Sequence, residues 1–295
     1  IQSPPAVAAA EAVRKYILET GAGIYDEKKR KGLLRHLIVR NAEGTGEVMV
    51  VLVIQKGQGA LPEPEELFYL LQEAMEAVEG EWKLRSLALS IHNGKSGAVL
   101  GEKLVFLYGQ ERIRDSFEDL DFLISPGSFY QVNTKQMKKL YGVVKAFAGL
   151  TGSETVFDLY CGVGTISLYL AEQAKQVVGI ESVEAAVLDA NRNAIGNGIV
   201  NAIFHCGKAE ELLPEMVAAG AEADVAVLDP PRAGCGKALL DAVAEAGTER
   251  IVYVSCNPST MARDVKYLGE LGYQVQKVQP VDLFPWTVHV ETVVL

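Results

Sequence analysis

A cysteine at the end of an apolar stretch is well placed in this chain for covalent chemistry. Cys256 follows the apolar residues 251–254 and is followed directly by Asn257 and Pro258. Open α/β sheets bind their ligands at the carboxyl ends of the strands, so a strand ending here would deliver the thiol to a ligand. A helix is predicted to begin just after Pro258, and a helix N-terminus lowers a thiol pKa from its free value of about 8.5. The stretch therefore predicts a nucleophilic thiolate.

Of the other three cysteines, Cys161 and Cys235 are alternative positions for a nucleophile. Cys206 ends a predicted strand and is expected to pack in the core, as free cysteines usually do. Cys161 lies in a glycine-rich turn that needs a small residue, and Cys235 lies between glycines in a loop. The four cysteines form no CxxC pair, which indicates reduced thiols without a disulfide framework or a zinc site.

A glycine-rich turn predicts a nucleotide-type cofactor. Gly162 and Gly164 follow the predicted strand 155–159 and open a helix, so the backbone can approach a ligand closely. Glu181 closes the next predicted strand, at the distance of about 20 residues where an acid accepts hydrogen bonds from ribose hydroxyls. A dinucleotide fingerprint would continue with a third glycine where this chain has Ser167. The pattern favours S-adenosylmethionine over NAD, with a purely structural turn as the alternative.

Two carboxylates complete the candidate chemistry. Asp229 opens an Asp-Pro-Pro-Arg sequence at the end of a predicted strand, the position that lies beside the transferable methyl group in doubly wound methyltransferases. Methyltransferases that act on amino groups have a similar sequence followed by an aromatic residue, and Arg232 in its place disfavours amino-group methylation. Glu291 stands in the apolar stretch 288–294, where desolvation would raise its pKa toward that of a general base. An exposed edge-strand glutamate is the alternative.

A metal site is not predicted at this stretch. With a period of two, His289 and Glu291 share one face of the predicted strand. A zinc ion would need further ligands, and no cluster of His or Asp supplies them.

The elements that must position these side chains lie in residues 128–295, where predicted strands and helices alternate regularly. This alternation predicts an α/β fold with a doubly wound, mostly parallel sheet of the methyltransferase type. The predicted strands are 155–159, 176–180, 202–205, 225–228, 250–254, 275–278 and 288–294. The predicted helices are 165–173, 183–193, 237–245 and 260–270.

Residues 1–127 mix helices and strands in another order, which predicts a smaller α+β domain of ferredoxin-like type. Two amphipathic stretches predict helices, and four apolar stretches predict strands. The helices are 5–19 and 62–79, and the strands are 37–39, 48–54, 87–91 and 103–107. Nothing in this part suggests catalysis, and a role in assisting RNA binding is expected.

Composition limits the classes of partner. A chain of 295 residues with 49% hydrophobic residues has enough apolar material for a folded two-domain protein. It contains neither an apolar run of about 18 residues nor a secretory leader, which predicts a cytoplasmic protein without a membrane span. The net charge of −10 argues against a chain that simply coats nucleic acid. Lys29 and Arg30, in the basic run 28–31, are candidate RNA contacts, with a solvated surface as the alternative.

Five stretches together resemble the RNA uracil-C5 methyltransferase family, most closely its 23S rRNA members. They occur in the family's order and cover the second half of the chain. The stretches are 128–133, 158–162, 228–232, 254–258 and 289–291. Residues 1–127 look like the central domain of that family, with less distinctive motifs.

The resemblance implies a reaction and a role for each matched residue. The family transfers a methyl group from S-adenosylmethionine to C5 of uridine, after a cysteine thiolate has added to C6. By resemblance, Cys256 is the nucleophile and Glu291 removes the C5 proton. The implied cofactor contacts are Gln131, Tyr160, Gly162, Glu181 and Asp229. Arg232 joins Lys29 and Arg30 as an expected RNA contact.

The substrate expected from the resemblance is 23S ribosomal RNA, modified by a monomer. The T-loop uridine of tRNA is the alternative substrate, and a non-catalytic RNA-binding module is the alternative of another class. Many members also have an N-terminal β-barrel, and some bind a [4Fe-4S] cluster through cysteines. In members with both, these parts lie largely ahead of the point where this chain begins, so we expect a cluster only in a longer chain.

Overall fold

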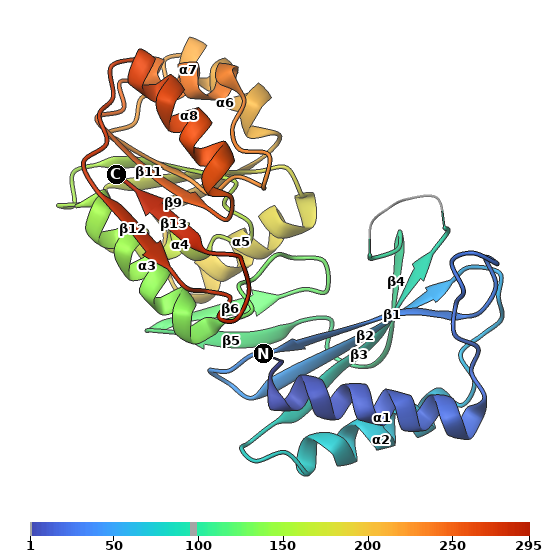
Figure 1. Ribbon diagram of the computed structural model, residues 1–295. Helices are drawn as coiled ribbons and strands as arrows, with labels where there is room; N and C mark the ends of the chain where they lie inside the picture. Colours follow the sequence, from blue (N-terminus) through green and yellow to red (C-terminus); the bar gives the residue numbers. More distant parts are fainter. Residues whose placement is uncertain (1, 95–98) are drawn as a thin grey trace. The chain divides into compact units, whose positions relative to one another are not determined.

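The computed structural model describes residues 2–94 and 99–295 and divides the chain into two compact units (Figure 1). The first unit comprises residues up to Ser116 and residues 123–127. The second comprises residues 117–122 and 128–295. The segment 117–122 thus groups with the second unit, whereas the sequence-based boundary assigned it to the first.

The first unit is a four-stranded sheet with two helices on one face. Its elements are α1 (Pro4–Thr20), β1 (Leu34–Asn41), β2 (Glu47–Gln55), α2 (Pro64–Glu76), β3 (Lys83–His92) and β4 (Lys103–Gly109). The strand order is β1-β2-β3-β4, and only β2 and β3 are parallel, because α2 carries the chain back between them. The unit is α+β, but its element order, α-β-β-α-β-β, differs from the β-α-β-β-α-β order of ferredoxin-like folds.

A two-stranded sheet of β5 (Ile113–Phe117) and β6 (Leu120–Ile124) follows β4. The helix α3 (Thr134–Ala148) then opens the main part of the second unit and was not predicted. Its buried residues have the spacing of one helical face, and they are Met137, Leu140, Tyr141, Val144 and Ala148. Asn133 caps its first turn by accepting a hydrogen bond from the Gln136 backbone at 3.2 Å.

The second unit contains a seven-stranded sheet in the order β12-β13-β11-β10-β7-β8-β9. The strands are β7 (Thr155–Leu159), β8 (Gln176–Glu181), β9 (Ala202–Cys206), β10 (Val225–Leu228), β11 (Arg250–Ser255), β12 (Val278–Val281) and β13 (Glu291–Val294). The strands from β7 to β11 pair in parallel, and β13 is antiparallel to both of its neighbours. The predicted doubly wound, mostly parallel sheet is therefore confirmed.

Helices cover both faces of this sheet (Figure 1). They are α4 (Thr165–Ala171), α5 (Glu184–Gly196), α6 (Ala209–Ala218), α7 (Lys237–Glu245) and α8 (Pro258–Glu270). Apolar residues of α6, α7 and α8 pack with those of β7, β8, β10 and β11 in one core. The helices α3, α4 and α5 contact the sheet from the other face.

The last two strands differ from their predicted positions. The predicted strand 275–278 is found three residues later as β12, and only the second half of the predicted strand 288–294 forms β13. His289 therefore lies outside the strand that begins at Glu291. Because β13 inserts between β12 and β11, Glu291 is not on an edge strand, and its side chain is buried.

Within the described residues, no helix combines the length and apolar character that a membrane span requires.

Candidate active site

One cavity in the second unit collects the predicted cofactor and catalytic residues. It has a volume of about 660 Å³, within the usual range of small-molecule sites of about 300–1,000 Å³. Its walls include Gln131, Tyr160, Gly162, Glu181, Asp229, Arg232, Cys256 and Glu291. It lies at the carboxyl ends of the parallel strands, where open α/β sheets bind their ligands. Another cavity, of about 480 Å³, lies beside the end of α8 and contains none of these residues.

Strand register brings the proposed nucleophile and base together. The strands β11 and β13 are antiparallel, and Ser255 pairs with Thr292. Cys256 directly follows the last residue of β11, and Glu291 directly precedes Thr292, so the register continued by one residue places these two opposite each other. Paired positions of an antiparallel ladder project to the same face, because side chains alternate along both strands. Both side chains line the cavity.

The turn after β7 forms another wall of the cavity. Tyr160, Gly162 and Gly164 all have left-handed backbone conformations, with φ of +69°, +57° and +81°. A Cβ at Gly164 would lie 3.0 Å from the Phe204 ring, so glycine is needed there. Ser167, at the position of a third glycine, donates a hydrogen bond to the buried Asp158. This serine therefore fixes the strand end to the helix that follows.

Glu181 organises the backbone around this turn. One carboxylate oxygen accepts a hydrogen bond from the Gly162 N–H at 3.1 Å, and the other accepts from the Val183 N–H at 2.8 Å. The carboxylate lines the cavity and remains partly exposed to it. It thus ties the ends of β7 and β8 together while presenting acceptor oxygens to a ligand.

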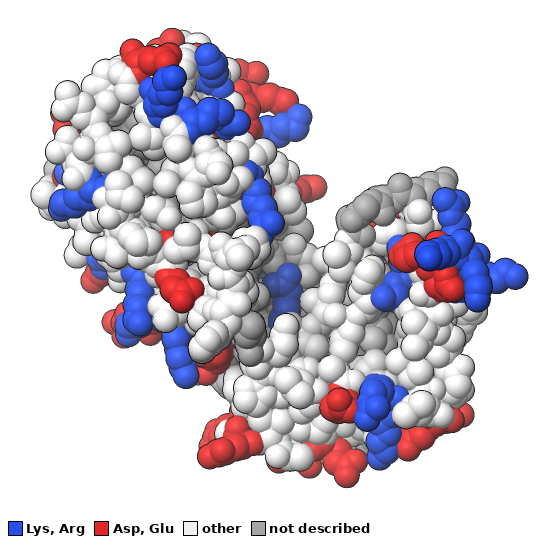
Figure 2. Space-filling view, viewed as in Figure 1, with Lys and Arg blue, Asp and Glu red and all other residues white. Residues whose placement is uncertain are grey.

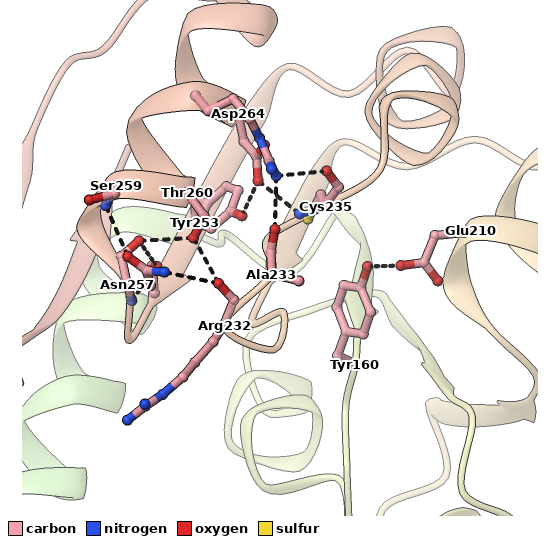
Figure 3. A network of polar contacts seen from close by, with 12 residues as sticks. Tyr160, Glu210, Arg232, Ala233, Cys235, Tyr253, Asn257, Ser259, Thr260 and Asp264 are labelled. Atoms are coloured by element: carbon pink, nitrogen blue, oxygen red, sulfur yellow. Dashed lines mark hydrogen bonds and ion pairs between the residues drawn. The ribbon is translucent and has the colours of Figure 1, made fainter.

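Two cavity residues that the sequence analysis missed lie at the start of α6. The Tyr160 hydroxyl donates to Glu210 at 2.5 Å (Figure 3). Lys208, just before α6, lines the same wall. Pro214 lies within this helix and obscured it in the sequence. The acidic pair Glu210 and Glu211 in its first turn is a helix-start signal that could have revealed it.

The loop that carries Arg232 is anchored on the first turn of α8 (Figure 3). The Arg232 carbonyl accepts hydrogen bonds from Asn257 Nδ2 at 3.0 Å and from Thr260 Oγ1 at 3.1 Å. The Arg232 side chain extends away from this network and forms part of the cavity wall. Its guanidinium lies 3.5 Å from His289 Nε2. The residues after Cys256 therefore fix the main chain of Arg232.

A buried carboxylate secures the rest of the same loop (Figure 3). Asp264 of α8 accepts hydrogen bonds from the Cys235 N–H at 2.8 Å and the Tyr253 hydroxyl at 2.7 Å. Arg263 pairs with Asp264 at 2.7 Å and donates to the Ala233 carbonyl at 2.9 Å. These contacts hold residues 233–235 against α8.

The pKa of the Cys256 thiol is raised from its ordinary value, contrary to the prediction of a lowered one. Burial is the main cause, and the carboxylates of Glu291 and Asp229 add to it. Arg232 opposes the shift. Burial and negative charge therefore outweigh the helix N-terminus that was expected to stabilise the thiolate.

Two carboxyl groups of the cavity, those of Glu291 and Asp229, have raised pKa values. Burial raises the pKa of Glu291, and Arg232 lowers it, so the direction predicted for Glu291 is confirmed. The pKa of Asp229 rises to about 8, mainly through burial and then through the charges of Glu291 and Asp158. A carboxylate with a raised pKa is a stronger base, which suits a group that must accept a proton.

The remaining cysteines lie outside this cavity. The prediction that Cys206 packs in the core is wrong, because the side chain at the end of β9 is exposed. Cys161 and Cys235 are both buried. Burial raises the pKa of Cys235 to about 12 and that of Cys161 well above its ordinary value. Buried thiols of this kind are poor nucleophiles.

Lys29 and Arg30 belong to the first unit and do not line the cavity. Both are exposed in a turn where Asp26 accepts hydrogen bonds from the backbone of Lys28 and Lys29. On the face drawn in Figure 2, basic side chains are interspersed with acidic ones on both units. Among the residues that the structure describes, no three His, Cys, Asp or Glu form a group suited to a metal ion.

Comparison with known proteins first defines the class of fold. A methyltransferase from Agrobacterium tumefaciens that depends on S-adenosylmethionine has a TM-score of 0.53, 15% identity and 88% coverage of both chains. This likeness shows the fold alone. The tRNA (uracil-54, C5)-methyltransferase of Pyrococcus abyssi, solved with S-adenosyl-L-homocysteine, has a TM-score of 0.78 and 34% identity. It covers 97% of this chain, which covers 66% of that one.

The family follows from the sequence. The model of the tRNA (uracil-5-)-methyltransferase family matches residues 101–295, so the chain belongs to this family. An uncharacterized RNA methyltransferase of Halalkalibacterium halodurans is 46% identical over 281 residues, which cover 95% of this chain and 60% of the relative. The resemblance to RNA uracil-C5 methyltransferases is confirmed. The chain spans about three fifths of the length of the curated relatives it matches.

Proposed function

We propose that this chain transfers a methyl group from S-adenosylmethionine to C5 of a uridine in RNA through a covalent adduct with Cys256. The observation that carries the proposal is that the last pair of β11 and β13, Ser255 with Thr292, directly adjoins Cys256 and Glu291, which both line the cavity. A thiol and a carboxylate facing each other at a cofactor-sized cavity are the minimum set for this reaction. Membership of the uracil-5 family supports the proposal.

Uracil C5 is too weak a nucleophile to take a methyl group without activation. Addition of the Cys256 thiolate to C6 forms an S–C6 bond and moves the C5=C6 electron pair into an enolate, which gives C5 carbanion character. After C5 has been methylated, Glu291 accepts the C5 proton. The electron pair of that C–H bond restores the C5=C6 double bond, and the S–C6 bond breaks to release the thiolate.

Arg232 has a distinct electrostatic task in this scheme. The Cys256 thiol must lose its proton before it adds, while burial and two nearby carboxylates keep it protonated. Arg232 lowers the pKa of both Cys256 and Glu291. We assign it the role of favouring the reactive, charged forms of both groups, beside its expected contact with RNA.

The residues of the cavity fit S-adenosylmethionine, whose sulfonium supplies the methyl group. Glu181 presents carboxylate oxygens suited to ribose hydroxyls, and the absent side chain of Gly162 leaves the adjacent wall open. Gln131, Tyr160 and Asp229 complete the proposed cofactor contacts. Tyr160 is held in place by Glu210.

The class of RNA has two candidates. The motif resemblance favours 23S ribosomal RNA, which we retain as the first substrate. The T-loop uridine of tRNA is the second, because the solved relative from Pyrococcus abyssi is a tRNA (uracil-54, C5)-methyltransferase. Lys29 and Arg30 stay as proposed phosphate contacts in the first unit, and a monomer is the proposed state.

Release of tritium from RNA labelled at C5 of uridine tests the reaction itself. Transcripts of 23S rRNA and tRNA are each incubated with protein and S-adenosylmethionine, and tritiated water is measured. The proposal predicts release that depends on the cofactor and matches the methyl groups incorporated. Methyl incorporation without tritium release would place the methyl elsewhere and reject C5 as the target. The transcript that releases tritium identifies the RNA class.

A further inference from the structure

The loop between β12 and β13, red in Figure 1, directly precedes the proposed base in the chain and carries two strongly exposed apolar side chains. Trp286 is 93% exposed, and Val288 is 95% exposed. Glu291 follows directly at the start of β13 and lines the cavity. A tryptophan this exposed is uncommon, because its large ring gains most from burial.

Hydrogen bonds within the loop hold Trp286 in this position. The Phe284 carbonyl accepts from the Thr287 N–H at 3.2 Å and from the Thr287 hydroxyl at 2.7 Å. The same hydroxyl accepts from the His289 N–H at 3.1 Å. Trp286 itself has a left-handed backbone with φ of +68°, which is unfavourable for a bulky residue. The turn therefore holds the Trp286 indole outward, although the left-handed backbone of this residue is energetically unfavourable.

A second segment of the cavity rim adjoins this loop. Asn133 Nδ2 donates to the Leu283 carbonyl at 3.0 Å, which ties the residues before α3 to the start of the loop. In that segment Phe129 is 68% exposed and lines the cavity, and Val132 is 74% exposed. We call Phe129, Val132, Trp286 and Val288 the apolar rim. Of these four only Phe129 lines the cavity, and the other three lie on the two segments that the Asn133 hydrogen bond joins. Exposed apolar groups on segments next to a binding cavity mark an interaction site.

We infer that the apolar rim binds an unpaired nucleobase next to the target uridine, with Trp286 as the stacking residue. The inference rests on the proposed function. A uridine that reaches Cys256 must leave its stack, so its neighbours lose a stacking partner at the mouth of the cavity. An outward indole can replace that partner whatever the base, because every base has a flat π-face. His289 of the same loop lies 3.5 Å from the Arg232 guanidinium, and this pair suits the adjacent phosphate.

Fluorescence of Trp286 tests the contact directly. The chain has two tryptophans, so Trp82→Phe leaves Trp286 as the single indole. A short oligouridylate should quench this fluorescence saturably in the presence of S-adenosylhomocysteine. The same strand annealed to oligoadenylate should quench far less, because its bases are paired. Unchanged fluorescence with the single strand would overturn the inference.

Kinetics separate stacking from a structural effect. Trp286→Ala should raise the KM for the RNA transcript about tenfold, and Trp286→Phe should restore most of the loss, because base–aromatic stacking needs only a flat ring. The KM for S-adenosylmethionine should stay unchanged in both variants. Val200→Ala, which truncates another exposed side chain (93%) of the second unit, should leave both KM values unchanged.

The outcomes distinguish this inference from the proposed function. An active enzyme whose KM for RNA is unaffected by Trp286→Ala would refute the rim contact and leave the reaction standing. Quenching by single-stranded RNA in a protein that releases no tritium would retain the contact and reject the reaction. A dimer in sedimentation experiments that Trp286→Ala dissolves would overturn the inference and make the rim a self-association surface.

Discussion

At the scale of single residues, we expect the charges around Cys256 to determine the pH dependence of the proposed addition step. The pKa of the thiol is raised by burial and by Glu291 and Asp229, and it is lowered by Arg232. A thiol with a raised pKa is mostly protonated near neutral pH, so thiolate formation limits addition. The midpoint of adduct formation should therefore lie at a higher pH than for an ordinary exposed thiol.

Neutralising Arg232 should move this midpoint further. With Arg232→Gln, the opposing cation is lost, so the pKa of Cys256 rises and the pH profile shifts to higher pH. The measurement is the single-turnover rate of adduct formation with saturating 5-fluorouridine RNA, across a pH series. Lys266→Gln removes an exposed positive charge of α8 outside the cavity and should leave the midpoint in place. An identical midpoint in the Arg232 variant would remove Arg232 from thiol activation.

Glu181 should contribute to cofactor affinity through hydrogen bonds from its carboxylate. Glu181→Ala should weaken S-adenosylmethionine binding by about 1.5–3 kcal/mol, the usual loss when a hydrogen bond to a charged group is removed. Isothermal calorimetry measures the affinity. Glu184→Ala, at an exposed position in the first turn of α5, is the control and should bind normally. Unchanged affinity after loss of Glu181 would exclude it from the site.

At the scale of elements, the loop from Asp229 to Cys235 depends on its close approach to α8. Gly234 has φ of +76°, and a Cβ there would lie 2.4 Å from Asp264 Oδ2. Because Asp264 also holds Cys235 and Tyr253, it has little room to move. A side chain at Gly234 would therefore push the loop away from α8 and disturb the position of Arg232.

Gly234→Ala should lower the free energy of unfolding by about 2 kcal/mol or more. About 1–2 kcal/mol comes from the left-handed backbone, and the clash adds to it. Gly247→Ala is a matched control, because φ is +75° and nothing lies within 4 Å of its Cβ. Urea denaturation of both variants separates the cost of the left-handed backbone from the cost of the clash. Equal destabilisation would show that the loop yields to the extra methyl group at no cost.

The sequence predicted the parallel part of the sheet better than its last strands. The strand 155–159 and the helix 237–245 were found at the predicted residues, because their apolar patterns are long and bounded by turn residues. The strand β12 was predicted three residues too early, and β13 was predicted to begin three residues before it does. A short strand that runs against its neighbours is defined by the partners it pairs with, and local pattern does not reveal them.

In the candidate site too, features local in the sequence were predicted, and features that depend on distant parts of the chain were not. Motifs identified the residues at strand ends, such as Asp229 and Glu181, because their chemistry is local to each turn. The raised pKa of Cys256 was not predictable, because it results from burial and from carboxylates on other strands. Glu210 was missed because its helix contains a proline. Trp286 was missed because only its exposure in the folded chain distinguishes it.

At the scale of the whole molecule, the antiparallel neighbours β11 and β13 bring the proposed nucleophile and the proposed base to the same cavity. In the proposed reaction, Cys256 acts before methyl transfer and Glu291 acts after it. Cys256→Ala should abolish methylation and the covalent RNA complex together. Glu291→Gln should still permit addition and methyl transfer, because the amide occupies the same place without acting as a base.

The most direct test is the fate of labelled methyl in the Glu291→Gln protein. RNA is incubated with this variant and methyl-labelled S-adenosylmethionine, and the products are separated by denaturing electrophoresis. The account predicts a labelled protein–RNA adduct that accumulates, because the C5 proton stays in place and the thiolate cannot leave. The double variant Cys256→Ala, Glu291→Gln should form none. Normal turnover by Glu291→Gln, or a labelled adduct that persists without Cys256, would contradict the account.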